Sequence, residues 1–418
     1  MDWLGTATGA TEPARGRAAP ATSANPAARS STPASTVNER GMWLSSDAER
    51  MPSERASFGE RRARAATKLR ERHLDALLVS PGADLFYLAG YQLGASERLT
   101  CLVLDAEGRA TLVCPAFEAP RASAAVPDVD RATWDETNDP YAIVASLVRG
   151  SAAVAVADQM WAAYLLPLQR ALPRREFEVA SAITRELRIR KDAGEVDALR
   201  AVSEAADRAY SGILERRFTG RTEREVGADL AELLRAQGHD EVGFTIVGSG
   251  ANGASPHHDA GDRRIVDGDT VVLDFGGAMR GYCSDITRTV HVGQTAGSEE
   301  QKVHDVVLRA QEAGYAAARK DASAESVDAA SRKVIDEAGY GDFFIHRTGH
   351  GIGIEGHEHP YLVRGNRERL EPGMAFSIEP GVYLPGRFGV RIEDIAVIDR
   401  DGSARRLNRA SHAFATVA

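Results

Sequence analysis

Hydrophobic and polar positions alternate in short runs through the first part of the globular sequence. A charged stretch with Ala and Leu at helical spacing covers residues 61–72, and an apolar run follows it. Apolar runs at 99–104 and 110–114 flank a turn, which predicts a β-hairpin. Another short strand is predicted at 151–157. Because strands alternate with helices here, we expect a small α/β domain over residues 57–187.

The pattern changes after a charged junction at residues 187–195. Short strands and glycines fill 242–294 and 342–400, and a capping box at 222–225 marks the start of a helix. We therefore expect an α+β domain over residues 188–418. Its helices are predicted at 195–214, from 222 onward, at 298–319 and at 323–338.

The N-terminal stretch has a different composition. Ala, Pro, Ser, Thr and Gly make up 27 of the first 40 residues, and large apolar side chains are scarce. Such a stretch cannot bury enough surface to offset its ordering entropy, so we expect disorder over residues 1–56. No basic start is followed by an apolar segment, so no secretory signal peptide is expected. The alternative is that the biological start is Met42 or Met51 and that the tail is a mis-assigned extension.

Composition and charge exclude several classes of protein. The 418 residues carry 51 Lys and Arg against 60 Asp and Glu, a net charge of −9 without a long basic run, so nucleic acid is not an expected partner. No apolar run reaches the length of about 18 residues that a transmembrane helix needs. Cys101, Cys114 and Cys283 form no CxxC pair, which excludes a zinc ribbon and favours a cytoplasmic location.

A weak internal repeat links four carboxylates. In both copies a turn glycine precedes an apolar strand, which ends at Asp274 in one copy and at Glu379 in the other. A second carboxylate follows each of them, Asp285 in the first copy and Glu393 in the second. This spacing predicts two hairpins that each present one carboxylate per strand. Chance similarity is the alternative explanation for two segments so short.

These carboxylates and one histidine form a chemically sensible metal set. A carboxylate among apolar residues is costly unless it is paired or binds a cation. Taken singly, each carboxylate also fits a strand end or a salt bridge, and a lone histidine is more often structural. Together, four carboxylates balance the charge of two divalent cations, and one imidazole beside them favours Mn²⁺, Fe²⁺, Co²⁺ or Zn²⁺. The candidate ligands are Asp274, Asp285, His350, Glu379 and Glu393.

The segment around His350 also contains a GxGxxG pattern at residues 351–356. A dinucleotide-binding fingerprint must open a helix after a strand. Pro360 and Pro372 follow here instead, so we expect no Rossmann site. These glycines are expected to let the backbone pass close to the metal centre and its substrate.

Taken together, these motifs resemble the pita-bread metallopeptidases, the family of prolidase, Xaa-Pro aminopeptidase and methionine aminopeptidase. The five candidate ligands match that family's metal ligands in kind, order and approximate spacing. The resemblance covers residues 57–418 and implies an α+β pita-bread catalytic domain that follows a smaller creatinase-type α/β domain. The matching segments are Val-Leu-Asp-Phe-Gly, Ser-Asp-Ile-Thr-Arg-Thr, Gly-His-Gly-Ile-Gly, Ser-Ile-Glu-Pro-Gly-Val-Tyr and Gly-Val-Arg-Ile-Glu-Asp.

The resemblance also implies a role for each candidate ligand. Asp274 is expected to bind one metal ion. His350 and Glu379 are expected to bind the other. Asp285 and Glu393 are expected to bridge the two ions.

Further residues are assigned by the same resemblance. His257 and His357 match the family's two other active-site histidines, and Arg391 matches an arginine near its site. His258, beside His257, is a further candidate for substrate binding. Some prolidases use an arginine for the substrate carboxylate at the position where this chain has Tyr361, so selectivity for dipeptides is open here.

The resemblance implies a metal-dependent Xaa-Pro dipeptidase. A hydroxide bridging the two metal ions is expected to attack the peptide carbonyl, with Glu379 as general base and His257 or His357 donating to the oxyanion. Arg364 is the expected substitute for the missing carboxylate-binding arginine. Manganese is the expected metal, with Co²⁺ or Zn²⁺ as alternatives, and the expected form is a cytoplasmic homodimer that acts on proline-containing peptides.

Two alternative functions stay open. One is an Xaa-Pro aminopeptidase that acts on longer peptides. The other is a non-peptidase hydrolase of the creatinase type. Family members of that second kind usually lack several metal ligands, whereas this chain has all five.

Overall fold

The computed structural model describes residues 52–293 and 296–418. Most of the predicted tail, residues 1–51, lies outside the described residues, and so do both alternative start positions. Helix α1 (Pro52–Glu71) begins before residue 57, so its first residues belong to the stretch that was predicted as tail.

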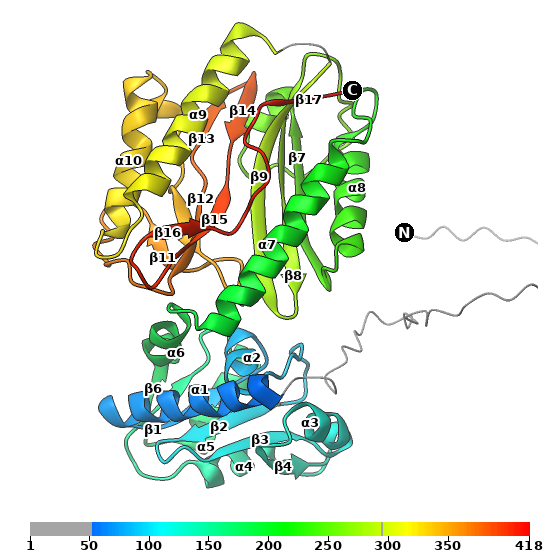
Figure 1. Ribbon diagram of the computed structural model, residues 1–418. Helices are drawn as coiled ribbons and strands as arrows, with labels where there is room; N and C mark the ends of the chain where they lie inside the picture. Colours follow the sequence, from blue (N-terminus) through cyan, green and yellow to red (C-terminus); the bar gives the residue numbers. More distant parts are fainter. Residues whose placement is uncertain (1–51, 294–295) are drawn as a thin grey trace, which may run out of the picture. The chain divides into compact units, whose positions relative to one another are not determined.

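A six-stranded mixed sheet forms the N-terminal domain (Figure 1), which confirms the expected α/β class. β2 and β3 pair antiparallel as the predicted hairpin, whereas β1 pairs parallel with β5. The strand order is β4 (Asp130–Trp134), β3 (Ala110–Pro115), β2 (Cys101–Asp105), β1 (Leu74–Val79), β5 (Ala153–Val156) and β6 (Glu176–Val179). The other helices are η2 (Ala116–Glu118), α2 (Ala83–Ala89), α3 (Ala119–Ala125), α4 (Pro140–Leu147), α5 (Ala162–Ala171) and α6 (Ser181–Arg188).

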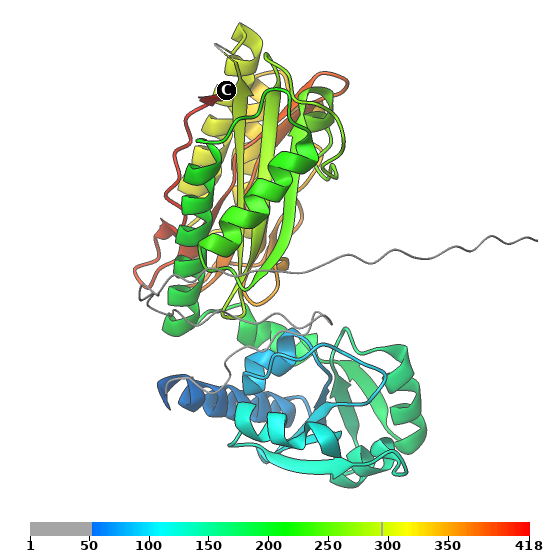
Figure 2. The same ribbon diagram turned by 90° about the vertical axis from the view of Figure 1, so that its right-hand side faces the viewer.

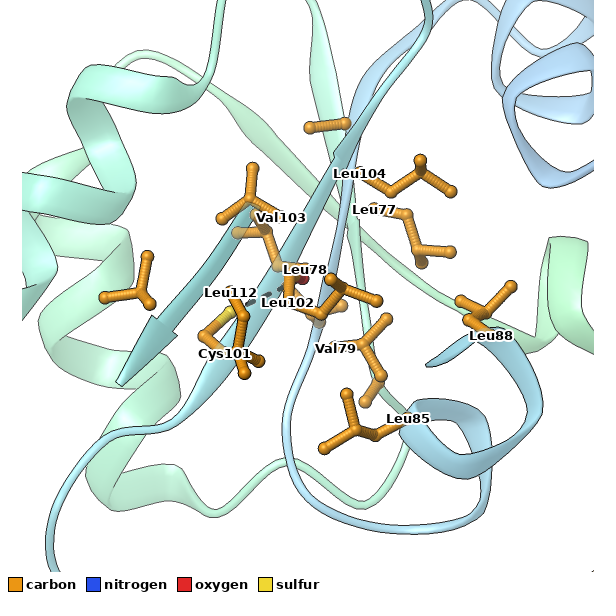
Figure 3. Packing of buried hydrophobic residues seen from close by; sticks show 14 of the residues in the cluster. Leu77, Leu78, Val79, Leu85, Leu88, Cys101, Leu102, Val103, Leu104 and Leu112 are labelled. Carbon is orange, nitrogen blue, oxygen red and sulfur yellow. Dashed lines mark hydrogen bonds between the residues drawn. The ribbon is translucent and has the colours of Figure 1, made fainter. Parts of the chain in front are cut away.

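The central strands of this sheet are apolar without alternation because both faces are covered. Leu77 and Leu78 point to opposite faces of β1, and both are fully buried. Burying one such side chain contributes roughly 1.5–3 kcal/mol to folding. Figure 3 shows this core, where β1 and β2 meet α2 through Leu77, Leu78, Val79, Leu102, Leu104, Leu85 and Leu88.

Two helix pairs support the catalytic domain. A capping box starts each helix of the first pair: Asp192 caps α7 and pairs with Glu195 in its first turn, and Thr222 caps α8 and pairs with Glu225. The second of these boxes was predicted. Figures 1 and 2 show α7 and α8 along one set of strands and α9 and α10 along the other. The helices are α7 (Ala193–Ile213), α8 (Glu223–Ala236), α9 (Ser298–Ala317) and α10 (Ala324–Glu337).

The strands of this domain form three sheets. One has the order β17 (Ala415–Val417), β9 (Tyr282–Val292), β8 (Thr270–Met279) and β7 (Glu241–Ser249). A second has the order β11 (Glu358–Leu362), β10 (Gly349–Gly351), β12 (Ala375–Ile378), β15 (Asp394–Ile398) and β16 (Ala404–Arg406). The third is β13 (Gly381–Leu384) with β14 (Phe388–Arg391), and short 3₁₀ turns lie at η3 (Gly250–Ala254) and η4 (Gly341–Phe343).

The predicted pair of carboxylate hairpins is right in its first copy and incomplete in its second. β8 and β9 form one antiparallel hairpin. In the second copy β12 pairs with β15, and the hairpin β13–β14 is inserted between them. The repeat in the sequence therefore marks matching strand pairs, but only one of them is a simple hairpin.

Two expected absences can be compared with the described residues. After β10 the chain continues at 352–357 without helix, as expected for a segment that is not a dinucleotide fingerprint. Within residues 52–293 and 296–418, no helix combines the length and the apolar character that a membrane crossing requires.

Candidate metal centre

The register of β8 and β9 sets the first two carboxylates side by side. Asp274 lies directly opposite Thr287, and Gly276 lies opposite Asp285. Opposed residues of an antiparallel pair point to the same face, and so do residues two positions apart on one strand. Asp274, Thr287 and Asp285 therefore share one face, and all three side chains are buried.

A bridge between the two sheets brings in the other two carboxylates. Ile378 pairs with Asp394, so Glu379 and Glu393 occupy the next position of that antiparallel pair. Thr287 forms an isolated β-bridge with Glu393, and its Oγ1 donates a hydrogen bond of 2.6 Å to Oε2 of Glu393. This hydroxyl thus orients one candidate ligand. Thr287 was not among the predicted site residues, although its position two residues after Asp285 indicates that it shares that face.

His350 approaches the carboxylates from β10, the strand beside β12. The neighbouring glycines allow this, because a Cβ at Gly349 would lie 2.0 Å from the carbonyl oxygen of Ser377. Nδ1 of His350 lies 3.0 Å from the carbonyl oxygen of Gly351, so Nδ1 carries a proton and donates it there. Nε2 faces the centre, 3.2 Å from Oε1 of Glu379 and 3.6 Å from Oδ2 of Asp285.

All five predicted ligands are gathered in one place. Three overlapping groups each bring their ligand atoms within 4.8 Å of one another. Asp285, His350 and Glu393 each belong to two of the groups. The groups are Asp274, Asp285 and Glu393; His350, Glu379 and Glu393; and Asp285, His350 and His357.

Burial and like charges raise the pKa values of three of these carboxyl groups. Burial is the largest cause for Asp274, Asp285 and Glu393. The charge of Asp274 adds to the effect at Asp285, and the charge of Asp285 adds to it at Glu393. Glu379 differs: burial opposes its ionisation, but the hydrogen bond and charge of His350 lower its pKa to about 2.

Two carboxylate oxygens of the candidate metal centre have no hydrogen-bond donor and are suited to bind a cation. Oδ1 of Asp274 and Oε1 of Glu393 are buried without a hydrogen-bond partner. Buried carboxylate oxygens are costly unless a hydrogen bond or a metal ion satisfies them. The donor set of carboxylates with one imidazole, oriented by second contacts at Thr287 and Gly351, is therefore suited to divalent metal ions.

Arg391, predicted to bind substrate, is instead committed to the centre itself. Its Nη2 forms an ion pair with Oδ2 of Asp274. Its Nη1 donates to the hydroxyl of Tyr383 at 2.9 Å, and its Nε donates to Oγ1 of Thr287 at 3.0 Å. A fourth contact, of 3.3 Å from Nη1, reaches the carbonyl oxygen of Pro256. This buried guanidinium orients Asp274 and has few donors left for a substrate.

The loop with His257 and His258 is anchored by a residue that the sequence analysis missed. Nε2 of His258 donates to Oε2 of Glu223 at 2.7 Å, which occupies a side chain predicted to bind substrate. Glu223 is fully buried at the start of α8 and also accepts from Oγ of Ser249 at 2.6 Å and from Asn252. Although burial opposes ionisation, these hydrogen bonds lower the pKa of Glu223. His257 is exposed in the same loop.

His357 lies next to the centre and is a neutral side chain at pH 7. Its ring centroid is 3.9 Å from that of His350. Nη2 of Arg347 lies 3.4 Å from its Nδ1. Burial, followed by the charges of His350 and Arg347, lowers the pKa of His357 to about 4. Arginine only donates, so Nδ1 accepts and the proton of the neutral ring lies on Nε2.

The two remaining substrate candidates lie on and after β11. Tyr361 pairs with His350 across the β10–β11 ladder, so its side chain lies on the face of the metal centre. Arg364 is exposed on the loop that follows this strand. The structure thus brings Tyr361 to the site and shows no contact between the site and Arg364 among the described residues.

Known proteins are similar to this chain in sequence and in fold. Residues 197–400 match the model of metallopeptidase family M24, and residues 61–190 match that of the creatinase/prolidase N-terminal domain. A Mycobacterium tuberculosis protein named "Probable dipeptidase PepE" is 44% identical over 365 residues, which cover 86% of this chain and 96% of that protein.

Two further relatives extend the comparison. The Xaa-Pro dipeptidase of Lactobacillus helveticus is 34% identical over 343 residues, 80% of this chain and 93% of that protein. The crystal structure of dipeptidase PepE from Mycobacterium ulcerans superposes with a TM-score of 0.81 at 44% identity, covering 87% of this chain and 99% of that one. The chain belongs to metallopeptidase family M24, and it is a metallopeptidase with a creatinase/prolidase N-terminal domain.

Proposed function

We propose that this metallopeptidase hydrolyses Xaa-Pro dipeptides with two divalent metal ions. The observation that carries the proposal is the gathering of five ligand-type side chains around two buried carboxylate oxygens that have no hydrogen-bond partner. The substrate class is supported by similarity to proteins named dipeptidase and Xaa-Pro dipeptidase.

Two ions fit the overlap of the ligand groups. Asp274 belongs to one group, and Glu379 belongs to another. Asp285, Glu393 and His350 belong to two groups each. Nδ1 of His350 donates to Gly351, so only the two carboxylates have a second atom that could serve a second ion. Four carboxylates balance the charge of two divalent ions, so the loaded centre would be close to neutral before water binds.

Divalent ions at such a centre supply Lewis acidity toward a carbonyl oxygen and lower the pKa of water. The chain's own residues then orient and move protons. Glu379 is ionised at neutral pH, so its carboxylate can take a proton from the attacking water and deliver it to the leaving nitrogen. The Nε2–H of His357 can donate to the carbonyl oxygen as negative charge develops there.

Proline is a special leaving group for a peptidase. The Xaa-Pro bond is a tertiary amide, so it has no N–H, and the ring fixes φ. A site that donates the proton to the nitrogen only during cleavage does not need that N–H for binding. We propose Mn²⁺ as the resident metal because carboxylate ligands suit it, with Co²⁺ or Zn²⁺ as alternatives that a site with one imidazole also accepts.

An aminopeptidase acting on longer peptides is the second candidate. Tyr361 stands where some prolidases have a carboxylate-binding arginine, and Arg391 is committed to Asp274, Tyr383 and Thr287. If no other cation holds the substrate carboxylate, dipeptides have no advantage over longer chains.

The experiment compares Leu-Pro, Leu-Pro-Ala and Leu-Ala as substrates of metal-loaded protein. We expect Leu-Pro to be cleaved fastest and Leu-Ala to be cleaved poorly. Faster cleavage of Leu-Pro-Ala would make the enzyme an aminopeptidase. Absence of turnover with all three, with metal bound, would point to another substrate class.

We also propose that the chain acts as a homodimer in the cytoplasm, as its family resemblance implies. Sedimentation velocity at micromolar concentration should give about twice the mass of 44.8 kDa. A monomer at that concentration would contradict the dimer.

A further inference from the structure

Arg347 lies at the edge of the metal centre, two residues before β10. Its guanidinium carbon is 4.4 Å from the ring centroid of Tyr361. Its Nη2 lies 3.4 Å from Nδ1 of His357, whose ring in turn contacts His350. Only the ring of His357 therefore separates Arg347 from His350, a candidate metal ligand. Nothing in its sequence position had marked it as part of the site.

The ring of Tyr361 gives this guanidinium a fixed support. Tyr361 is the direct ladder partner of His350, so the two side chains leave the sheet on one face. An arginine stacked on an aromatic face keeps its planar donors in a defined direction and gains a cation–π contact. The residue that replaces the family's arginine thus holds another arginine in place.

The donors of Arg347 are largely unused. A guanidinium has five N–H donors, and the contact with His357 takes one. Among residues 52–293 and 296–418, no carboxylate forms an ion pair with Arg347. In contrast, Arg391 has an ion pair with Asp274 and three neutral hydrogen-bond partners.

A half-buried guanidinium without an anion, beside a peptidase centre, suits a negatively charged part of the substrate. A dipeptide carries one, the free carboxylate of its second residue, which follows the scissile bond directly. Arginine and carboxylate match as a two-pronged, charge-assisted pair. A longer peptide has a neutral amide at that position and cannot form this pair.

We propose that Arg347, supported by Tyr361, binds the free C-terminal carboxylate of dipeptide substrates and so sets the preference for dipeptides. This inference rests on the proposed function. Arg347 is then a specificity-determining residue of the enzyme, and Arg364 and Arg391 do not have that role.

The experiment compares a free acid with its neutral analogue. Leu-Pro and Leu-Pro amide differ only in the carboxylate, and KM and kcat for both are measured on metal-loaded wild-type protein and on Arg347→Met. Methionine keeps an unbranched apolar stem against Tyr361 while it removes the charge. We expect KM for Leu-Pro to rise about 10- to 100-fold, as for the loss of charged hydrogen bonds, and KM for the amide to change less than about 3-fold.

Three further variants sharpen this comparison. Arg347→Lys keeps a charge but loses the two-pronged geometry, so KM for Leu-Pro should lie between those of the wild type and Arg347→Met. Arg364→Met tests the residue that was predicted from the sequence to bind the carboxylate. It should leave the ratio of KM for Leu-Pro to KM for Leu-Pro amide unchanged. Arg367→Met is the matched control, because its side chain is 89% exposed on the same loop.

Four outcomes would overturn the inference. Equal loss of kcat on the acid and the amide in Arg347→Met would mean that Arg347 acts only through His357. An unchanged KM for Leu-Pro in that variant would remove its role in binding. A raised KM in Arg364→Met alone would transfer the role to Arg364. If the wild type cleaves neither substrate, the proposed function fails as well, which separates that case from the other three.

Discussion

At the scale of single residues, the candidate metal centre gathers several carboxylates and provides few positive charges to balance them. Burial raises the pKa values of Asp274, Asp285 and Glu393, and neighbouring carboxylates, Glu379 among them, raise each of the three further. One arginine, Arg391, pairs with Asp274. These crowded carboxylates lower the stability of the metal-free protein, and the free energy of metal binding can offset that cost.

Asp285→Asn should therefore act in opposite directions on the two forms of the protein. Without metal, removing one of the crowded carboxylates should raise the melting temperature. With metal, the lost shared ligand should lower both the melting temperature and bound metal, and kcat should fall at least about 10²-fold. Thermal unfolding with and without chelator, together with metal analysis, checks this.

Asp262→Asn is the control, because its side chain is 85% exposed on a loop. Asp262→Asn should leave the melting temperature unchanged both with and without metal. A metal-free Asp285→Asn protein that is less stable than the metal-free wild type would contradict the charge argument.

At the scale of elements, local patterns predicted the strands and tertiary contacts decided how they assemble. The apolar runs that end in Asp274 and Glu379 were visible in the sequence, and so was the capping box of α8. The insertion of β13–β14 between β12 and β15 was not visible in the sequence. A turn glycine and an apolar run predict a strand, but they do not indicate which strand it pairs with.

The burial of Glu223 shows why some functional residues could not be predicted. In sequence it is an ordinary acidic residue in the first turn of a helix, where acids are common. Only the fold brings the loop of His257 and His258 back over that helix end. The place of Thr287 two residues after Asp285 indicated a shared face, but its hydrogen bond to Glu393, 106 residues later, comes only from the fold. The contacts of Arg347 with Tyr361 and His357 depend on the fold in the same way.

Glu223→Ala should destabilise the protein and loosen the loop that carries His257. The change leaves Ser249, Asn252 and His258 without their buried acceptor, which should cost about 3 kcal/mol or more. We also expect kcat to fall, because His257 loses its fixed position. Denaturant unfolding and steady-state kinetics measure the two effects.

Glu232→Ala on the same helix is the matched control, since its pair with Arg216 spans 3.6 Å and its side chain is 68% exposed. It should cost less than about 0.5 kcal/mol. Equal effects of the two substitutions would contradict the anchoring role of Glu223.

At the scale of the whole molecule, a charged junction joins the N-terminal domain to the loop that carries His357. Nη2 of Arg188, at the end of α6, contacts Glu355 and Glu358 at 2.6 Å each. Lys191 contacts Glu358 at 3.1 Å, and both of these side chains are buried. Although burial opposes ionisation, the charges of Lys191 and Arg188 lower the pKa of Glu358 to about 2.

Glu358→Gln should therefore destabilise the enzyme by about 3–5 kcal/mol, because it leaves Lys191 as an uncompensated buried charge. The neighbouring His357 should lose its position, so kcat should also fall. The matched control is Glu368→Gln, which removes a more exposed pair between α6 and the catalytic domain, Arg185 with Glu368 at 2.8 Å. That control should cost less than about 1 kcal/mol, and a similar loss in both variants would refute the special role of the buried junction.

Stability should also depend on pH through His304 in α9. Burial lowers its pKa from 6.5 to about 4. Between these values the unfolded chain binds a proton that the folded chain does not, so stability is present above pH 6.5 and is lost as pH falls toward 4. The loss should approach about 3 kcal/mol for this one group.

His304→Gln isolates that contribution from the other titrating groups. The difference in unfolding free energy between wild type and variant should shrink from pH 7 to pH 4.5, measured by denaturant unfolding at each pH. A difference that is independent of pH would show that His304 does not titrate as its burial implies.

If two divalent ions at this centre are needed to cleave the Xaa-Pro bond, activity must follow metal binding, which a metal titration measures. Chelated protein is titrated with Mn²⁺ while bound metal per chain and proline release from Leu-Pro are measured together. We expect negligible turnover without metal and full turnover as the ratio approaches two ions per chain. Turnover that persists after chelation, or none with two ions bound, would contradict the proposed function.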